Sequence, residues 1–219
     1  MITSYKSILD FLRIDFPLVF KNSLLLGIVY LFLIPVIRGT SNLDAIHSAD
    51  VFGQSLVLTG AILLIPITKW ELETSVKEIV CTKAWSYIKS VSIRLICGFL
   101  LITVMIVTFA FIMQFKNCVF PFWEYVSVTI LYAVFLGILG LCFSQFAGNV
   151  IVGYLAVLGY WSLCQFRIIC EGDMLYMFPF VKGIINMERV WILLGTDIVL
   201  ISSFQVMVKW SKKDFFCRK

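Results

Sequence analysis

Residues 125–146 read YVSVTILYAVFLGILGLCFSQF, a stretch without aspartate, glutamate, lysine or arginine. A helix needs about 20 apolar residues to cross the ~30 Å hydrocarbon core of a bilayer. Soluble domains carry about 25% charged residues and seldom leave so long a stretch uncharged. The stretch therefore predicts a transmembrane helix and decides the fold class of the chain.

The rest of the chain has the same character. Of its 219 residues, 61% are hydrophobic and 14% are charged. Apolar runs predict six spans, at 18–37, 51–67, 95–115, 125–146, 150–170 and 190–208. We expect an all-α, polytopic membrane protein with six transmembrane helices, forming a single transmembrane domain over residues 1–219.

The N-terminal segment is amphipathic, because its apolar side chains recur at helical spacing and its charged side chains fall mostly on the opposite face. This pattern predicts an interfacial helix over residues 1–17, with a break at Pro17 before the first span. The same pattern fits a helix packed against protein, so that alternative stays open. Asp10 and Asp15 interrupt the apolar residues and no small-residue cleavage site follows, which does not fit a signal peptide.

Basic residues predict the orientation, since cytoplasmic loops are enriched in lysine and arginine. Thirteen would lie on one side of the membrane, at Lys6, Arg13, Lys21, Lys69, Lys77, Lys83, Lys89, Arg94, Lys209, Lys212, Lys213, Arg218 and Lys219. Five would lie on the other side, at Arg38, Lys116, Arg167, Lys182 and Arg189. We expect a multi-pass protein of the cell membrane whose N-terminus and C-terminal tail, 209–219, are cytoplasmic. Contact with lipid headgroups accounts for the net charge of +5, and no nucleic acid is needed.

Small residues recur along the fourth and fifth spans, at Ala133, Gly137, Gly140, Ser144, Gly148, Gly153, Ala156, Gly159 and Ser162. Small residues let helices approach closely. They predict a packed hairpin around a tight turn at 147–149, although packing against a second subunit fits the same pattern. The seven cysteines are scattered as small hydrophobic residues would be, and a disulfide between Cys118 and Cys170 is left open.

Several kinds of chemistry are excluded by the residues present. The chain has one histidine, His47, which is too few for a zinc hydrolase. It contains neither a G-x-S-x-G nucleophile motif nor the G-x-x-x-x-G-K-[ST] motif of ATP-binding loops. We expect no catalytic residue, no metal and no cofactor bound by this chain, so energy for any work would come from another subunit.

A charged stretch separates the second and third spans. Residues 69–94 read KWELETSVKEIVCTKAWSYIKSVSIR. Val76, Ile79 and Val80 follow helical spacing and carboxylates surround them, which predicts a short amphipathic helix along the membrane surface within 69–92.

This stretch resembles the coupling helix of type-2 ABC exporter permeases, the type V exporter fold. In that family the coupling helix begins with a carboxylate-rich patch and continues to an apolar pair, a turn and a basic residue that opens the third helix. The matching residues here are Glu71, Glu73, Thr74, Glu78, Ile79, Val80, Ser86 and Arg94. Glu73 replaces the usual glycine, and Lys83 or Ala84 stands where proline is common. The six spans, the N-terminal helix and the tight turn extend the resemblance over nearly the whole chain.

The resemblance implies a permease subunit that exports an amphiphilic or peptide-like substrate, such as an antimicrobial peptide, by alternating access. It implies that Glu71, Glu73, Thr74, Glu78, Ile79 and Ser86 dock onto a separate ABC ATPase subunit, which supplies the ATP. It also implies a dimer with a second copy or a sister permease. A non-transporting membrane scaffold, sensor or immunity protein is the alternative that the residues leave open.

Two features lie on the predicted outer side. Residues 171–189, EGDMLYMFPFVKGIINMER, are rich in aromatics and methionines; they fit either an interfacial belt or, by the resemblance, short re-entrant helices. Arg167 and Asp197 fall inside the predicted fifth and sixth spans, where charges are costly and need partners. From the predicted boundaries the two residues lie at depths that differ by ~6 Å, at 1.5 Å per residue. We therefore expect an intramembrane charge pair between Arg167 and Asp197, of which removing one member costs more than removing both.

Overall fold

The computed structural model describes residues 2–69, 87–166, 168–169, 176, 178, 180–181, 184–185 and 187–217. The described part is helical apart from its loops and one antiparallel pair of two-residue strands, β1 (Phe180–Val181) and β2 (Ile184–Ile185). The long helices are α1 (Ile2–Arg38), α6 (Tyr87–Phe115), α7 (Phe122–Ala147), α8 (Val150–Gln165) and α9 (Met187–Cys217). Between α1 and α6 the chain forms α2 (Ala45–Asp50), the π-helix η1 (Val51–Leu56), α3 (Leu58–Leu64) and the 3-10 helix η2 (Ile65–Thr68).

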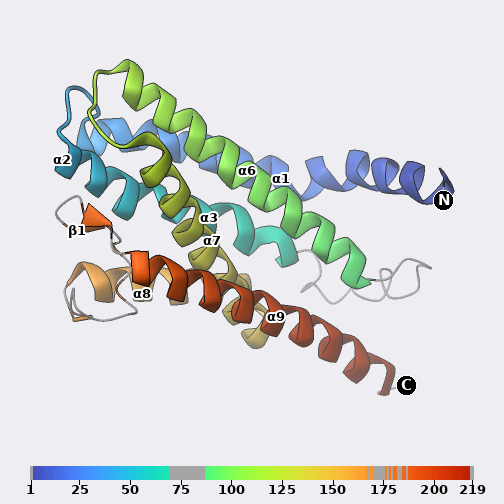
Figure 1. Ribbon diagram of the computed structural model, residues 1–219. Coiled ribbons are helices and arrows are strands. Elements are labelled where there is room, and N and C mark those ends of the chain that lie inside the picture. Colours follow the sequence, from blue (N-terminus) through green and yellow to red (C-terminus); the bar gives the residue numbers. More distant parts are fainter. Residues whose placement is uncertain are drawn as a thin grey trace.

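The helices run back and forth along one bundle (Figure 1). Both chain termini lie at one end of it, here named the termini end, together with the end of η2 and the start of α6. The connections after α1 and after α6 lie at the other end, here named the loop end, with α2 and β1. The alternation of direction follows the sequence prediction.

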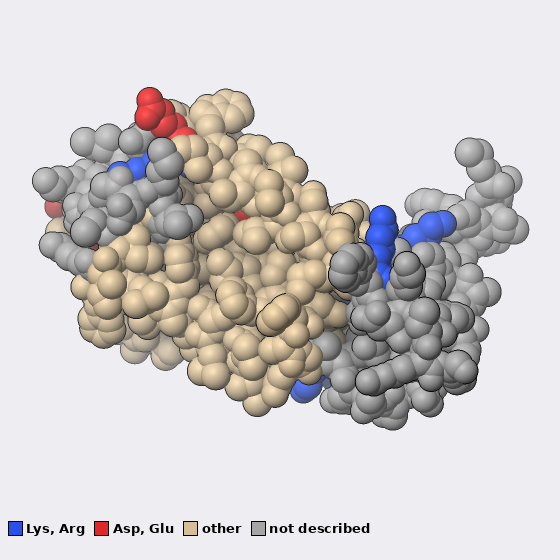
Figure 2. All heavy atoms as spheres, turned by 90° about the horizontal axis from the view of Figure 1, so that it is seen from below, with Lys and Arg blue, Asp and Glu red and all other residues tan. Residues whose placement is uncertain are grey.

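Five segments are long and apolar enough to cross a membrane: Asp15–Arg38, Ala45–Thr68, Lys89–Phe115, Phe122–Ala147 and Met187–Lys209. The apolar helix α8 is shorter, with 16 residues. Figure 2 shows charged side chains gathered toward the two ends of the molecule, with a middle band in which almost none is visible. Many large hydrophobic side chains of the long helices are exposed, among them Phe32, Leu100 and Leu155. This distribution fits a helical membrane protein, whose spans present apolar side chains to lipid.

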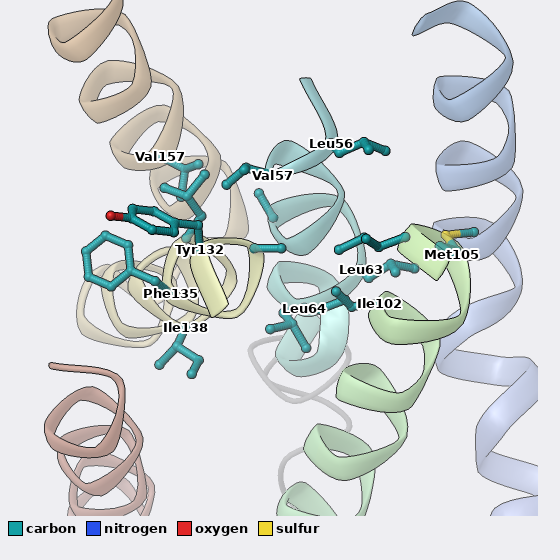
Figure 3. Close-up of a cluster of buried hydrophobic side chains, with 14 of the residues drawn as sticks. Leu56, Val57, Leu63, Leu64, Ile102, Met105, Tyr132, Phe135, Ile138 and Val157 are labelled. Atoms are coloured by element: carbon teal, nitrogen blue, oxygen red, sulfur yellow. The ribbon is translucent and has the colours of Figure 1, made fainter. Parts of the chain in front are cut away.

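Helix α7 occupies the centre of the bundle and packs against α3, α6, α8 and α9. Apolar side chains of α3 fill the space between α7 on one side and α6 on the other (Figure 3). A Cβ built on Gly60 of α3 would lie 1.8 Å from the carbonyl oxygen of Ala133 on α7. The backbones of α3 and α7 thus touch, which a side chain at residue 60 would prevent.

The predicted close packing of the two helices around the turn at 147–149 is confirmed for α7 and α8. A Cβ on Gly153 of α8 would lie 2.5 Å from the carbonyl oxygen of Gly140 on α7. Gly148 ends α7 with a left-handed φ of 66°, and the Asn149 side chain caps α8 by accepting a hydrogen bond from the Ile151 backbone N–H at 2.9 Å. Glycine tolerates this φ because it has no Cβ.

Several predicted boundaries are wrong. Pro17 lies inside α1, so the expected break between an N-terminal helix and the first span is not present. The second span begins at Ala45, six residues before the predicted start at 51, and therefore includes His47. Helix α8 ends at Gln165, five residues before the predicted end, and α9 continues through Lys209 to Cys217 where a tail was expected.

Candidate functional site

The predicted docking residues, Glu71 to Ser86, lie outside the described residues. The flanks of the segment are described: η2 ends at Thr68 and α6 begins at Tyr87, and both of these ends lie at the termini end of the bundle (Figure 1). Residues 87–92, the last part of the predicted 69–92 region, belong to α6.

Arg94, the basic residue of the coupling pattern, has a partner in the N-terminal segment. Its Nε donates to Asp15 Oδ2 at 2.6 Å, and a terminal guanidinium nitrogen donates to Oδ1 at 2.7 Å. The two side chains are 10% and 13% exposed. Paired N–H···O bonds of this kind are strong and directional. They join α1 to α6 across 79 residues of sequence. No local sequence pattern predicts this pairing.

The π-helix η1 is held by side chains from other elements. Three successive carbonyl oxygens accept hydrogen bonds: that of Gln54 from Trp161 Nε1 at 3.1 Å, that of Ser55 from the Tyr30 hydroxyl at 2.8 Å, and that of Leu56 from the Thr59 hydroxyl at 2.6 Å. A π-turn disturbs the regular hydrogen bonds of an α-helix and often marks a functional site. The donors come from α1, α8 and α3, so three helices meet at a segment that the sequence analysis treated as ordinary helix.

Polar contacts also tie the loop end together. The Gln54 side chain accepts a hydrogen bond from Arg38 and donates one to Asp50. Lys116 Nζ donates to the Thr40 hydroxyl at 3.0 Å, joining the loops that follow α1 and α6. Cys118, expected on the exterior as a disulfide candidate, is instead a buried free thiol whose Sγ lies 3.5 Å from the Thr40 carbonyl oxygen. Its candidate partner, Cys170, lies outside the described residues.

A small aromatic cavity lies toward the loop end between α7, α8 and α9. It has a volume of about 20 Å³, and it is lined by Tyr132, Phe135, Tyr160, Tyr176, Ile192, Leu193 and Thr196. Tyr176 and Phe178 belong to the predicted outer segment 171–189, and both are buried with their ring centroids 5.5 Å apart. These two residues show that part of the outer segment packs into the bundle, a point that its composition alone left open.

Asp197 follows Thr196 on α9 and lies near Tyr132, and both of these residues line the cavity. It is 5% exposed, and neither carboxyl oxygen has a hydrogen-bond partner among the residues that the structure describes. Arg167, its predicted partner, lies outside them. The ~6 Å estimate for their difference in depth assumed a span reaching residue 170, but α8 ends at Gln165. The estimate therefore no longer holds, and the pairing stays a prediction.

A groove of about 490 Å³ lies between α1 and α6. Its lining is apolar from Leu24 to Pro35 on α1 and from Leu101 to Ile112 on α6, apart from Thr108, and Lys116 stands at its loop end. No group of three or more histidine, cysteine, aspartate or glutamate side chains that could hold a metal ion occurs in the described ranges.

Comparisons with known protein families, with curated proteins and with solved structures found no match to this chain.

Proposed function

We propose that this chain is the membrane-spanning permease subunit of an ATP-binding cassette exporter. It moves an amphiphilic or peptide-like substrate out of the cell by alternating access, and a separate ATPase subunit supplies the energy. In this proposal α8 is the fifth of six spans, and its 16 residues extend ~24 Å, somewhat less than the ~30 Å hydrocarbon core.

The observation that carries the proposal is the position of the coupling-like segment. Its two flanks and both chain termini share one end of an apolar helical bundle (Figure 1). Basic residues counted on the cytoplasmic side occur in the segments that meet at this end: Arg13 in the N-terminal part of α1, Lys69 directly after η2, Lys89 in the first turn of α6 and Lys209 in the C-terminal part of α9. The termini end is therefore the cytoplasmic end in the proposal, where an ATPase could reach Glu71 to Ser86.

The Asp15–Arg94 pair supports the same proposal. Arg94 lies seven residues after Tyr87, the first residue of α6, which is ~10 Å along the helix. Tyr87 directly follows Ser86, the last of the predicted docking residues. A displacement of that segment by an ATPase would pass through α6 to α1, because the bidentate pair links the two helices. Alternating access needs helices that move as coupled units, and this contact provides one coupling.

Incomplete burial supports a partner within the membrane. Only 17% of the apolar window of α9 and 22% of that of α1 are buried inside the chain, against 72% for Ala45–Thr68. The faces of α1 and α9 are available to lipid or to the second permease, identical or sister, that the proposal requires. The apolar groove along α1 suits an amphiphilic substrate rather than a polar one.

Copurification tests the proposal. The tagged chain, expressed with the ABC ATPases of its host, should retain one ATPase in mild detergent and lose it in Glu78→Lys. Glu124→Lys is the matched control, because Glu124 is exposed at the first turn of α7, at the loop end. Loss of the ATPase in the control as well, or full binding and export with Glu78→Lys, would contradict the docking role. If no ATPase copurifies, the non-transporting alternative takes its place.

Thiol labelling tests the orientation separately. Cys118 is buried, so the neighbouring Val119, 72% exposed, is the better probe of the loop end. In intact cells an impermeant maleimide should label Val119→Cys and should leave Cys217, at the end of α9, unlabelled until the membrane is opened. The reverse pattern would invert the proposed topology.

A further inference from the structure

Asp197 is set apart from the other buried polar groups of the bundle. The remaining buried side chains without a hydrogen-bond partner in the described ranges are hydroxyls or an amide: Ser48, Thr68, Thr129, Ser144 and Gln145. Asp197 is the carboxyl group in this set, and both of its oxygens lack a partner. A hydroxyl without a partner loses one hydrogen bond, whereas an unpaired carboxylate loses the solvation of a full charge.

The position of Asp197 along α9 makes ionisation still less favourable. It follows Met187, the first residue of α9, by ten residues, which is ~15 Å along the axis and about half of a ~30 Å hydrocarbon core. Water is scarce at that depth, and a charge there needs a partner or a water-filled space.

The surroundings of Asp197 offer little to balance a negative charge. Among the residues that the structure describes, Tyr132 on α7 is an ionisable side chain close to it, and Cys164 on α8 and Arg189 on α9 also lie near Tyr132. Arg189 precedes Asp197 by eight residues, ~12 Å along the same helix. Where α6 meets α9, around Leu95, Phe99 and Ile201, the lining side chains carry no charge. A proton is then the simplest way to neutralise the carboxyl group.

A route for that proton leads toward the loop end. The aromatic cavity next to Thr196 has room for about one water molecule, and Tyr132, Tyr160, Tyr176 and Thr196 give it hydroxyl groups that both donate and accept. The hydroxyl of Tyr132 points away from α3 (Figure 3). Tyr176 also lines the cavity and is itself buried.

We propose that Asp197 is a proton-binding site inside the membrane, kept as the neutral acid in this arrangement and reached from the loop end through the tyrosine-lined cavity. Loss of the proton would place an unpaired charge between α7 and α9, which separates these helices or admits water. The site does not depend on the proposed export function, since it follows from the burial of Asp197 and from its lack of a hydrogen-bond partner among the described residues.

Reaction with an apolar carbodiimide tests the protonation directly. The acid O–H adds across one C=N bond: the proton goes to nitrogen, the carboxyl oxygen bonds to the central carbon, and an oxygen-to-nitrogen acyl shift gives a stable N-acylurea with nothing released. The full chain, purified and reconstituted in phosphatidylcholine vesicles, is treated with dicyclohexylcarbodiimide and mapped by peptide mass spectrometry.

The expected result is a single modified carboxyl group at Asp197, absent in Asp197→Asn. Asp15 is the internal control, since both of its carboxyl oxygens accept hydrogen bonds from Arg94, and we expect it to stay unmodified. In Tyr176→Ala, a water-soluble carbodiimide should reach Asp197 faster than in the native chain, because removing a large side chain from the lining enlarges the cavity.

Three results would overturn the proposal. An unreactive Asp197 that becomes reactive in Arg167→Gln would show the predicted ion pair instead. Reaction slowed by sodium or potassium ions at constant pH would show a metal cation bound to the carboxylate. Equal modification of Asp15 and Asp197 would show that the reagent reports exposure rather than a bound proton.

Discussion

Two carboxyl groups of the described residues, Asp15 and Asp197, lie largely inside the bundle, and their surroundings differ. Asp15, near the termini end, faces the guanidinium of Arg94 through two short hydrogen bonds. Asp197, about halfway across α9, has no such contact in the described part of the chain. A buried carboxylate is stable when a cation and donors replace its water, and otherwise it takes up a proton. The same residue type thus serves as a fixed link between helices in one region and as a titratable group in the other.

Breaking the link at Asp15 should give the largest effect. In Arg94→Gln the Asp15 carboxylate loses its charge partner, and the free energy of unfolding should fall by about 3 kcal/mol. Titration with SDS in mixed micelles, followed by tryptophan fluorescence, measures this change. The double variant Asp15→Asn/Arg94→Gln should recover most of the loss. Arg13→Gln, at an exposed position two residues from Asp15, is the matched control. An equal loss of stability in Arg94→Gln and Arg13→Gln would contradict a stabilising role of the Asp15–Arg94 pair.

The close contact between α3 and α7 can be tested with a substitution that changes packing and leaves the charge unchanged. Gly60→Ala places a methyl group against the backbone of Ala133, so the free energy of unfolding should fall by about 2 kcal/mol without any change in charge. Gly159→Ala is the control, because a Cβ there meets nothing within 4 Å. The same SDS titration serves for both variants. A Gly60→Ala protein as stable as Gly159→Ala would contradict the close approach of α3 and α7.

Removing a hydrogen bond between two neutral groups should have a smaller effect on stability. Tyr30→Phe removes the donor to the Ser55 carbonyl oxygen in η1 and should lower the free energy of unfolding by about 1 kcal/mol. Tyr154→Phe should change it little, since the Tyr154 hydroxyl has no hydrogen bond within the described part of the chain. Hydrogen exchange of the backbone amides of residues 51–60 provides a second measurement, with faster exchange expected in Tyr30→Phe alone.

The smallest effect should come from Asp197→Asn. Asparagine has nearly the shape of the neutral acid, so the free energy of unfolding should change by less than about 0.5 kcal/mol at neutral pH. At higher pH the native chain should lose stability relative to the variant, because ionisation of Asp197 favours the unfolded chain. Thermal melting from pH 6 to pH 9 checks the sign. A marked loss in Asp197→Asn that Arg167→Gln restores would establish the ion pair predicted from the sequence.

The sequence alone predicted much of the fold. Uncharged runs of about 20 residues mark helices that cross a bilayer, because every backbone group there must bond within its own segment. The alternation of spans, the turn at Gly148 and the hairpin of α7 and α8 follow from apolar length, glycine and small residues. Boundaries were less certain, since a run of hydrophobic residues does not show where a helix stops: α8 ends early at Gln165 and α1 passes through Pro17.

The tertiary structure decided which polar groups have partners. No spacing along the chain connects Asp15 with Arg94, because their contact depends on how α1 packs against α6. The hydrogen bonds of η1 come from residues as far away as Trp161, 107 positions along the chain. Asp197 could be recognised from the sequence as a costly charge in an apolar helix, but its lack of a hydrogen-bond partner in the described bundle appears only when α7, α8 and α9 are assembled. Hydrophobic length is a local property of a segment, whereas the satisfaction of a buried charge belongs to the packed bundle.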